Sequence, residues 1–192
     1  MELKKLVKDI VIDAATLPSL DVKDICSHSS NVTDGSLFVA IYGEEADGHD
    51  FIPQAIENGA AVVITNGREM GQLSVPNIQV ANPRLAASRV SAEYYGHPTH
   101  KLTVIGITGT NGKTTTASIL QQILCAAEIQ SAQLGTLGII ADGFAPEKSL
   151  TTPDPITLQK TFRELVNKGF TLSLIHISEP TRPERIADCG VW

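Results

Sequence analysis

A glycine-rich loop with a lysine and neighbouring threonines is the part of this chain best suited to chemistry. It is GTNGKTT, residues 109–115, and it follows the apolar stretch 101–108. Glycines let backbone N–H groups turn towards phosphate oxygens, and the N-terminus of a following helix adds a favourable potential. In such a loop Lys113 would reach the β- and γ-phosphates as the catalytic cation, and the Thr114 hydroxyl would ligate Mg²⁺.

The loop therefore predicts a site for ATP or GTP. The residues predicted to bind the nucleotide are Gly109, Thr110, Asn111, Gly112, Lys113, Thr114 and Thr115. The strict phosphate-loop pattern GxxxxGK[ST] is not met, because Ile107 stands where its first glycine belongs. The alternative is a glycine turn that leads into a helix and leaves an exposed lysine.

The elements on both sides of the loop predict a parallel α/β domain. Residues 101–108 form a continuous β-branched run, as expected of a strand buried on both faces of a parallel sheet. Apolar residues at helical spacing predict a helix over 114–127, and 156–169 predict an amphipathic helix. Residues 131–140 are typical of a strand and a turn. We therefore place the start of a nucleotide-binding domain at about 99–171.

The first half of the chain predicts a smaller α/β domain at about 1–98. Three short apolar runs are typical of strands: 36–42, 60–65 and 78–80. Two segments predict helices: 51–59 and 84–96. Asp50 is expected to cap the first helix and Gly59 to end it. The predicted fold class is α/β, with a small N-terminal α/β domain followed by the truncated start of a parallel-sheet, P-loop, ATP-binding domain.

Composition narrows the class of protein. The chain has 192 residues, 42% of them hydrophobic, and a formal net charge of −6. An acidic chain without lysine- or arginine-rich runs argues against a nucleic-acid partner. No apolar run reaches the roughly 18 residues of a membrane span. These features predict a cytoplasmic protein with no membrane partner, and they leave its oligomeric state open.

The cysteines and histidines show no metal-binding pattern. Cys26, Cys125 and Cys189 are far apart and lack disulfide or metal spacing, so buried reduced thiols are expected. The histidines without metal spacing are expected in loops or on the surface: His49, His97 and His100.

Three stretches together resemble the Mur ligase family, the ATP-dependent amide-forming enzymes of peptidoglycan precursor synthesis. The first is GITGTNGKTT, and the second is residues 29–64, SSNVTDGSLFVAIYGEEADGHDFIPQAIENGAAVVI. The third is LGTLG (134–138) with LTTPDPITLQ (150–159), which is similar to the branch that adds the third residue of the peptide. The resemblance covers about residues 10–171.

The resemblance implies a reaction and its substrates. ATP, with Mg²⁺, would phosphorylate the D-glutamyl γ-carboxylate of UDP-MurNAc-L-Ala-D-Glu. The acyl phosphate would then be attacked by the amine of a diamino acid, meso-diaminopimelate or L-lysine. Positioning and neutralisation of phosphate charge would supply most of the catalysis. Another branch of the family, or a non-catalytic module that binds a nucleotide or a UDP-sugar, remains an alternative.

The resemblance also implies substrate contacts. Matched position by position, they are Ser27, Ser29, Glu44, Glu45 and Ala46 for the UDP moiety, and Thr151 and Thr152 for the muramoyl peptide. His28-Ser29-Ser30 stands where relatives have Asp-Ser-Arg, and Leu150 replaces a polar residue. Plainer alternatives exist for each pair. Ser27 and Ser29 are then solvated loop hydroxyls, and Glu44 and Glu45 form a charged loop tip. Thr151 and Thr152 then form a cap and turn before the helix at Ile156.

The resemblance ends after Thr171. The following segment, LSLIHISEPTRPERIADCGVW, lacks the order of residues that relatives show there, and Pro180 and Pro183 oppose regular structure. We expect residues 172–192 not to be native, as after a frameshift or a translated cloning artefact, with a divergent natural tail as the alternative. The rest of the central domain and the domain that selects the amino acid are then missing, and the chain is expected to be inactive.

Overall fold

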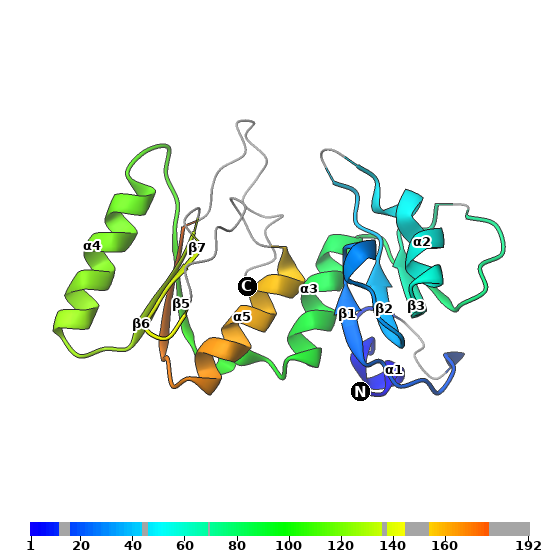
Figure 1. The fold of residues 1–192 in the computed structure, drawn as a ribbon, viewed down its shortest axis with the longest axis horizontal. Helices are drawn as coiled ribbons and strands as arrows, with labels where there is room; N and C mark the ends of the chain where they lie inside the picture. The colour runs from blue at the N-terminus through cyan, green and yellow to red at the C-terminus, as the bar shows by residue number, and fades with distance from the viewer. Residues whose placement is uncertain (12–15, 44–45, 69, 136–137, 145–153, 177–192) are drawn as a thin grey trace. The chain divides into compact units, whose positions relative to one another are not determined.

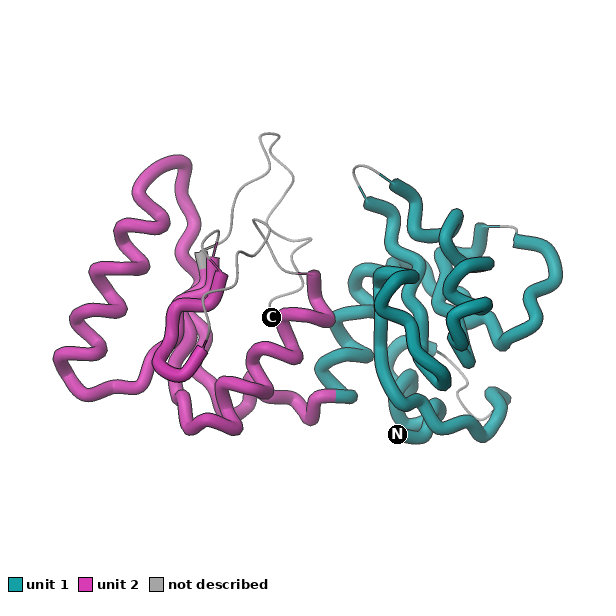
Figure 2. The backbone as a smooth tube through the Cα atoms, in the orientation of Figure 1, with its two compact units in different colours: residues 1–94 teal, residues 95–192 magenta. Residues whose placement is uncertain are grey.

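The computed structural model describes the chain except at residues 12–15, 44–45, 69, 136–137, 145–153 and 177–192. The chain divides into two compact units, Met1–Tyr94 and Tyr95–Trp192 (Figure 2). Each unit contains a four-stranded, largely parallel sheet with helices beside it (Figure 1). The predicted α/β class is therefore confirmed.

The sheet of the first unit is wholly parallel, and its strands follow chain order. They are β1 (Asp24–Cys26), β2 (Ser36–Val39), β3 (Ala60–Thr65) and β4 (Asn77–Gln79). Every residue of β2 is buried, and so is all of β3 except Ala61. Continuous apolar runs in a parallel sheet are buried in this way. The three strands predicted for this half of the chain are confirmed.

Helices precede, connect and follow these strands. They are α1 (Leu3–Leu6), η2 (Ser29–Asn31), η3 (Gly48–Phe51), α2 (Ile52–Glu57) and α3 (Pro83–Tyr94), where η denotes a 3-10 helix. Ile52 and Ala55 of α2 pack with Phe38 and Val63 of the sheet in one buried cluster. None of the helices within the described residues, in either unit, has the length and apolar character needed to cross a membrane.

The segment before α2 differs from the prediction. Asp50 does not cap a helix; instead the Asp47 carboxylate accepts a hydrogen bond from His49 N at 3.0 Å and caps η3. The reason is that a 3-10 helix precedes α2, so the first free N–H groups lie closer to Asp47. Gly59 has a φ of 104° and ends α2, as predicted.

The strand order of the second unit is β5-β8-β6-β7. The strands are β5 (Thr103–Ile107), β6 (Ser131–Gly135), β7 (Gly138–Ile140) and β8 (Leu172–His176). β8 is parallel to both β5 and β6, whereas β6 and β7 are antiparallel. The strand and turn predicted at 131–140 are confirmed, but β8 lies in a segment where no strand was predicted.

The described residues of this unit also form helices. They are η4 (Pro98–His100), α4 (Lys113–Ala126) and α5 (Pro155–Asn167). The Asp154 carboxylate caps α5 by accepting from Ile156 N at 3.0 Å and Thr157 N at 3.3 Å. One face of α5 buries Phe162 and Leu165 against the sheet. The two predicted helices, α4 and the amphipathic α5, are confirmed.

β5 is not buried on both faces, and that prediction was wrong. Thr103 and Gly106 are exposed, and the other residues of the strand are half-buried. The physical reason is its position, because β5 pairs only with β8 and forms an edge of the sheet in the described part of the chain.

The outer face of α4 is also uncovered. Ala117 is the one residue of this helix that is buried, and Ile119 and Ile123 are 53% and 59% exposed. Cys125 lies on the same helix and is exposed, so the prediction of a buried thiol was wrong there. Cys26 is buried as predicted, and Cys189 lies outside the described residues.

Ser173 introduces a hydroxyl into the apolar core of this unit. The strand register places it beside Val104 of β5 and Ala132 of β6, and both pack in a cluster that contains Phe162 and Leu165. Its Oγ is buried and has no hydrogen-bond partner among the described residues. A buried polar group left without a partner destabilises a protein by about 1–3 kcal/mol.

Ser173→Ala is therefore expected to raise the free energy of unfolding of the second unit by about 1 kcal/mol, because it removes the unpartnered hydroxyl. Urea denaturation, followed through NMR signals of each unit, measures the change. Ser91→Ala is the matched control: the Ser91 hydroxyl is also buried but donates to Ala87 O at 2.6 Å, so its loss is expected to destabilise the first unit. A loss of stability in Ser173→Ala would contradict the prediction.

Candidate functional site

The glycine loop joins the carboxyl end of β5 to the N-terminus of α4. Gly109 and Gly112 have φ values of 148° and 79°, which favour glycine over residues with side chains. A Cβ at Gly112 would meet nothing within 4 Å, so backbone conformation rather than crowding requires this glycine. The predicted strand, loop and helix thus follow one another in the order that a phosphate loop needs.

Lys113 folds back over the loop. Its Nζ donates to the carbonyl oxygen of Gly109 and, at 3.5 Å, to that of Thr110. Thr114 follows in the first turn of α4 and is half-buried. The ammonium group and the hydroxyl are therefore both carried by the loop and the first turn of α4.

The N-terminus of α4 has no side-chain cap. Its N-cap is Gly112, and no side chain forms a capping hydrogen bond. The bond from Thr116 N to Gly112 O, at 2.8 Å, is the one that opens the helix, so the N–H groups of Lys113, Thr114 and Thr115 lie ahead of it. N–H groups at a helix start, a lysine and two hydroxyls suit an anion such as a polyphosphate.

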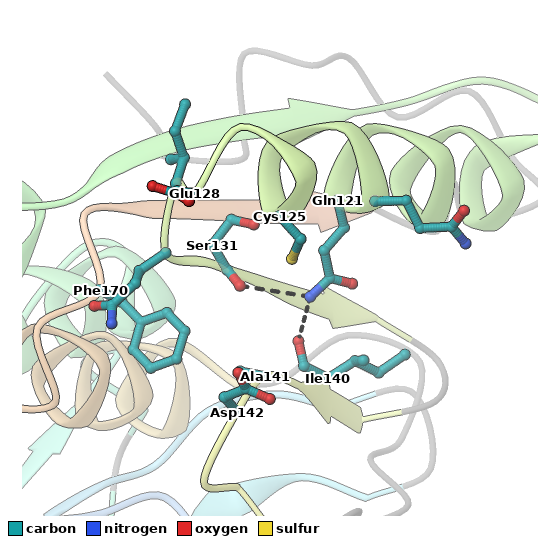
Figure 3. A pocket seen from close by; sticks show the side chains of 11 residues that line it. Gln121, Cys125, Glu128, Ser131, Ile140, Ala141, Asp142 and Phe170 are labelled. Atoms are coloured by element: carbon teal, nitrogen blue, oxygen red, sulfur yellow. Dashed lines mark hydrogen bonds between the residues drawn. The ribbon is translucent and has the colours of Figure 1, made fainter.

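A cavity of about 530 Å³ lies at the other end of α4 (Figure 3). Gln121 spans it and donates to Ile140 O at 2.8 Å, and Cys125, Glu128 and Asp142 also line it. None of its lining residues belongs to the loop 109–115, and no lysine or arginine is among them. The cavity lining therefore offers no side-chain cation to a phosphate, whereas the glycine loop carries Lys113.

The residues predicted to contact the UDP moiety belong to the first unit. Ser27 directly follows β1, and Ala46 lies in the connection after β2, so both belong to loops that leave the carboxyl edge of the parallel sheet. Ala46 is exposed, and its carbonyl oxygen accepts from Gly43 N at 3.0 Å. Ligands of open parallel sheets bind at this edge.

Ser29 is tied to α2. Its hydroxyl donates to Gln54 Oε1 at 2.7 Å, and its carbonyl oxygen accepts from Asn58 Nδ2 at 2.9 Å. The hydroxyl of this predicted contact is therefore already engaged. The remaining predicted substrate contacts lie outside the described residues: Glu44, Glu45, Thr151 and Thr152.

His49 is fully buried, and the prediction of a loop or surface histidine was wrong for it. Its Nδ1 lies 2.6 Å from Asp47 Oδ1, and its Nε2 accepts from Asn66 N at 3.3 Å. The segment GEEADGHD was expected to be a loop, but its last residues form η3 and bring His49 to Asn66, which follows β3. The ring is buried because both nitrogens find partners there.

Arg68 completes this cluster. Its Nη1 donates to Asp47 Oδ2 at 2.8 Å and to Asp50 Oδ1 at 3.3 Å. The pKa of Asp47 lies below its ordinary value, mainly because the carboxylate accepts from the backbone N–H of His49. The His49 ring and Arg68 also lower this pKa, whereas partial burial raises it. Sequence reasoning missed the cluster because Arg68 lies 21 residues from Asp47, so no local spacing reveals the pair.

Asp47 gives the first unit a defined acid sensitivity. Because its folded-state pKa lies below its ordinary value of 3.8, ionised Asp47 stabilises the fold above about pH 4, and this contribution is lost as pH falls through the folded pKa. Asp47→Asn is therefore expected to lower stability at pH 6 and to lose less on acidification than the unmodified chain. Urea denaturation at pH 3 to 7, followed by NMR signals of residues 1–94, measures this.

Asp9→Asn, at an exposed position without an ion pair among the described residues, is the control. Parallel pH profiles would contradict the prediction.

Two protein families match the chain. The family described as "Mur ligase family, catalytic domain" matches residues 21–95, and "Mur ligase middle domain" matches residues 107–185. The second match includes the glycine loop from Ile107 onwards and extends past Thr171, where the sequence resemblance was expected to end.

Individual relatives agree with these families. The chain is 37% identical over 168 residues to UDP-N-acetylmuramoyl-L-alanyl-D-glutamate–2,6-diaminopimelate ligase of Geobacter sulfurreducens, which covers 88% of this chain and 33% of the relative. It is 42% identical over 159 residues to the ligase of the same name from Bacillus velezensis, covering 82% and 32%. The chain thus spans about a third of the length of the curated relatives it matches.

Solved ligase structures have a similar fold. A ligase structure with that name superposes with a TM-score of 0.69 at 23% identity, over 93% of this chain and 36% of the other, and supports the fold. MurF ligase from Thermotoga maritima in complex with ADP superposes with a TM-score of 0.52 at 25% identity, over 81% of this chain and 32% of the other.

Proposed function

Since this chain belongs to the Mur ligase family, we propose that it is part of an ATP-dependent ligase that adds a diamino acid to UDP-MurNAc-L-Ala-D-Glu. The observation that carries this proposal is the glycine loop at the uncapped N-terminus of α4, with the Lys113 ammonium folded over it. The two relatives described above are both named as diaminopimelate ligases, which favours diaminopimelate over lysine as the amino acid.

The residues of the loop fit the triphosphate of ATP. The N–H groups of Lys113, Thr114 and Thr115 would donate to phosphate oxygens, and Lys113 Nζ would exchange its carbonyl partners for the β- and γ-phosphates. Thr114 would hold Mg²⁺ through its hydroxyl. Bound ATP would supply the phosphoryl group that activates the substrate carboxylate, and the loop would orient it and neutralise its charge.

The first unit would hold the uridine nucleotide end of the substrate. Its proposed contacts are Ser27, Ser29, Glu44, Glu45 and Ala46, and Thr151 and Thr152 would bind the muramoyl peptide. The position of Ser27 and Ala46 after β1 and β2 supports this proposal, because the carboxyl edge of a parallel sheet is where such ligands bind. A nucleotide-linked substrate made inside the cell would place the enzyme in the cytoplasm.

Binding and ligation experiments test the proposal separately. Isothermal titration of the full chain with Mg·ATP and with UDP-MurNAc-L-Ala-D-Glu is expected to show one site for each ligand. A ligase assay on this chain is expected to show no amide formation, and a chain completed to the length of its relatives is expected to show it. Failure of the completed chain to form the amide, with both ligands bound, would favour a non-catalytic binding module.

We further propose that residues 172–192 are not the native continuation of the chain. The order of residues after Thr171, which differs from the order that the resemblance implies there, supports this proposal. The family match to residue 185 argues against it, and so does the parallel pairing of β8 with both β5 and β6. Sequencing the source DNA across codon 171 decides the matter, and an open frame that encodes Leu172 to Trp192 would refute the proposal.

A further inference from the structure

Four residues of the first unit form a connected polar cluster, here named the His49 network: Asp47, His49, Asn66 and Arg68. Asp47 and His49 belong to the connection between β2 and α2, and Asn66 and Arg68 follow β3. The network therefore joins two neighbouring loops at the carboxyl edge of the sheet. Its centre is the His49 ring, which is fully buried.

The two nitrogens of the His49 ring have opposite roles. The backbone N–H of Asn66 can only donate, so Nε2 must accept and carries no proton. Nδ1 then carries the proton and donates to Asp47 Oδ1 at 2.6 Å. The contacts thus specify one neutral tautomer, and a ring protonated at both nitrogens would set a donor against the Asn66 N–H.

The network is joined to Ala46 through the neighbouring Asp47. Gly43 N donates to Ala46 O at 3.0 Å, and Tyr42 and Asp47 pair as an antiparallel bridge. Gly48 N donates to Ile41 O at 3.0 Å, and a Cβ on Gly48 would lie 2.6 Å from that oxygen. These contacts tie Ala46, Asp47 and Gly48 to the residues that follow β2, and the Asp47 carboxylate ties them to Arg68, which follows β3.

We propose that His49 is a positioning residue that holds Ala46 in place for a uridine nucleotide. This rests on the proposed function, in which Ala46 contacts the UDP moiety. His49 itself is buried and does not touch the ligand; it acts by donating to Asp47 and by accepting from Asn66. A contact group that is held by a packed, fully hydrogen-bonded neighbour binds without first losing conformational freedom.

Three substitutions separate the two hydrogen bonds. His49→Asn can still donate to Asp47, His49→Gln can still accept from Asn66, and His49→Leu does neither. The affinity of the full chain for UDP, measured by titration calorimetry, is expected to fall about tenfold in His49→Leu and less in the other two. The affinity for Mg·ATP is expected to stay unchanged in all three.

Two controls distinguish positioning from general loss of stability. Val90→Ala removes buried methyl groups from α3, outside the network, and is expected to lower stability while leaving the affinity for UDP unchanged. Asp47→Asn keeps an oxygen that can accept from His49, and it is expected to retain more UDP affinity than Asp47→Ala. Circular dichroism checks that each variant folds.

Nitrogen-15 NMR of the unmodified chain tests the geometry independently of the variants. The Nδ1-protonated tautomer of His49 is expected near neutral pH, and the Nε2-protonated tautomer would overturn the proposal. A folded His49→Leu chain with UDP affinity within twofold of the unmodified chain would also overturn it. If the unmodified chain binds neither UDP nor UDP-MurNAc-L-Ala-D-Glu, the proposed function of the first unit fails, and this inference fails with it.

Discussion

Lys113→Ala is expected to weaken the binding of Mg·ATP to the full chain by roughly 100-fold or more, because charge-assisted hydrogen bonds to phosphate are among the strong ones. The side chain places its ammonium over the loop, beside the carbonyl oxygens of Gly109 and Thr110. No other residue of the loop 109–115 carries a positive charge. Titration calorimetry at constant ionic strength measures the change.

Lys101→Ala is the matched control for this substitution. Lys101 lies in the same unit, just before β5, is exposed and has no ion pair among the described residues. Lys101→Ala changes the net charge by the same amount as Lys113→Ala. It is expected to alter the affinity for ATP by no more than about twofold, because charges in solvent beyond the Debye length are screened. Equal effects of the two substitutions would show that Lys113 acts only through net charge.

Gly59→Ala is expected to destabilise the first unit by about 3 kcal/mol, the sum of a left-handed backbone and an overpacked contact. Gly59 has a φ of 104°, and a Cβ there would lie 2.8 Å from Asp34 Cα and 3.1 Å from Asp34 N. Both atoms are backbone at the turn that leads into β2, so neither can rotate aside. Urea denaturation, followed by NMR signals of residues 1–94, measures the loss.

Gly71→Ala separates the two contributions. Gly71 has a φ of 67°, but a Cβ there would meet nothing within 4 Å. Its substitution therefore retains the backbone strain without the close contact, and about 1 kcal/mol of destabilisation is expected. Losses of the same size at both glycines would contradict the role assigned to the contact with Asp34.

The features that sequence reasoning predicted well are local ones. The run AAVVIT predicted a strand at 60–65, and β3 is Ala60–Thr65, because its last four residues are β-branched and such residues favour strands. The glycine loop could be found for the same reason, since its glycines, Lys113 and Thr114 are contiguous. Gly59 ended α2 as predicted, because a left-handed residue after a helix is a property of neighbouring residues.

The features that sequence reasoning missed depend on partners that lie far away along the chain. Whether β5 is covered depends on which strands pair with it, and β8 pairs with it from about 70 residues later. The apolar residues Ile119 and Ile123 predicted the helix α4 correctly, but their spacing does not reveal how much of that helix the sheet covers. His49 was assigned to the surface because its partner Asn66 is 17 residues away.

The strand order of the two units has a consequence for synthesis on the ribosome. In the first unit the spatial order β1-β2-β3-β4 repeats the order of translation, so each strand can join a neighbour already made. In the second unit β8 lies between β5 and β6 but is translated after both. The strand that carries the glycine loop therefore has no partner in this sheet until residues 172–176 emerge, and the loop gains its rigid support last.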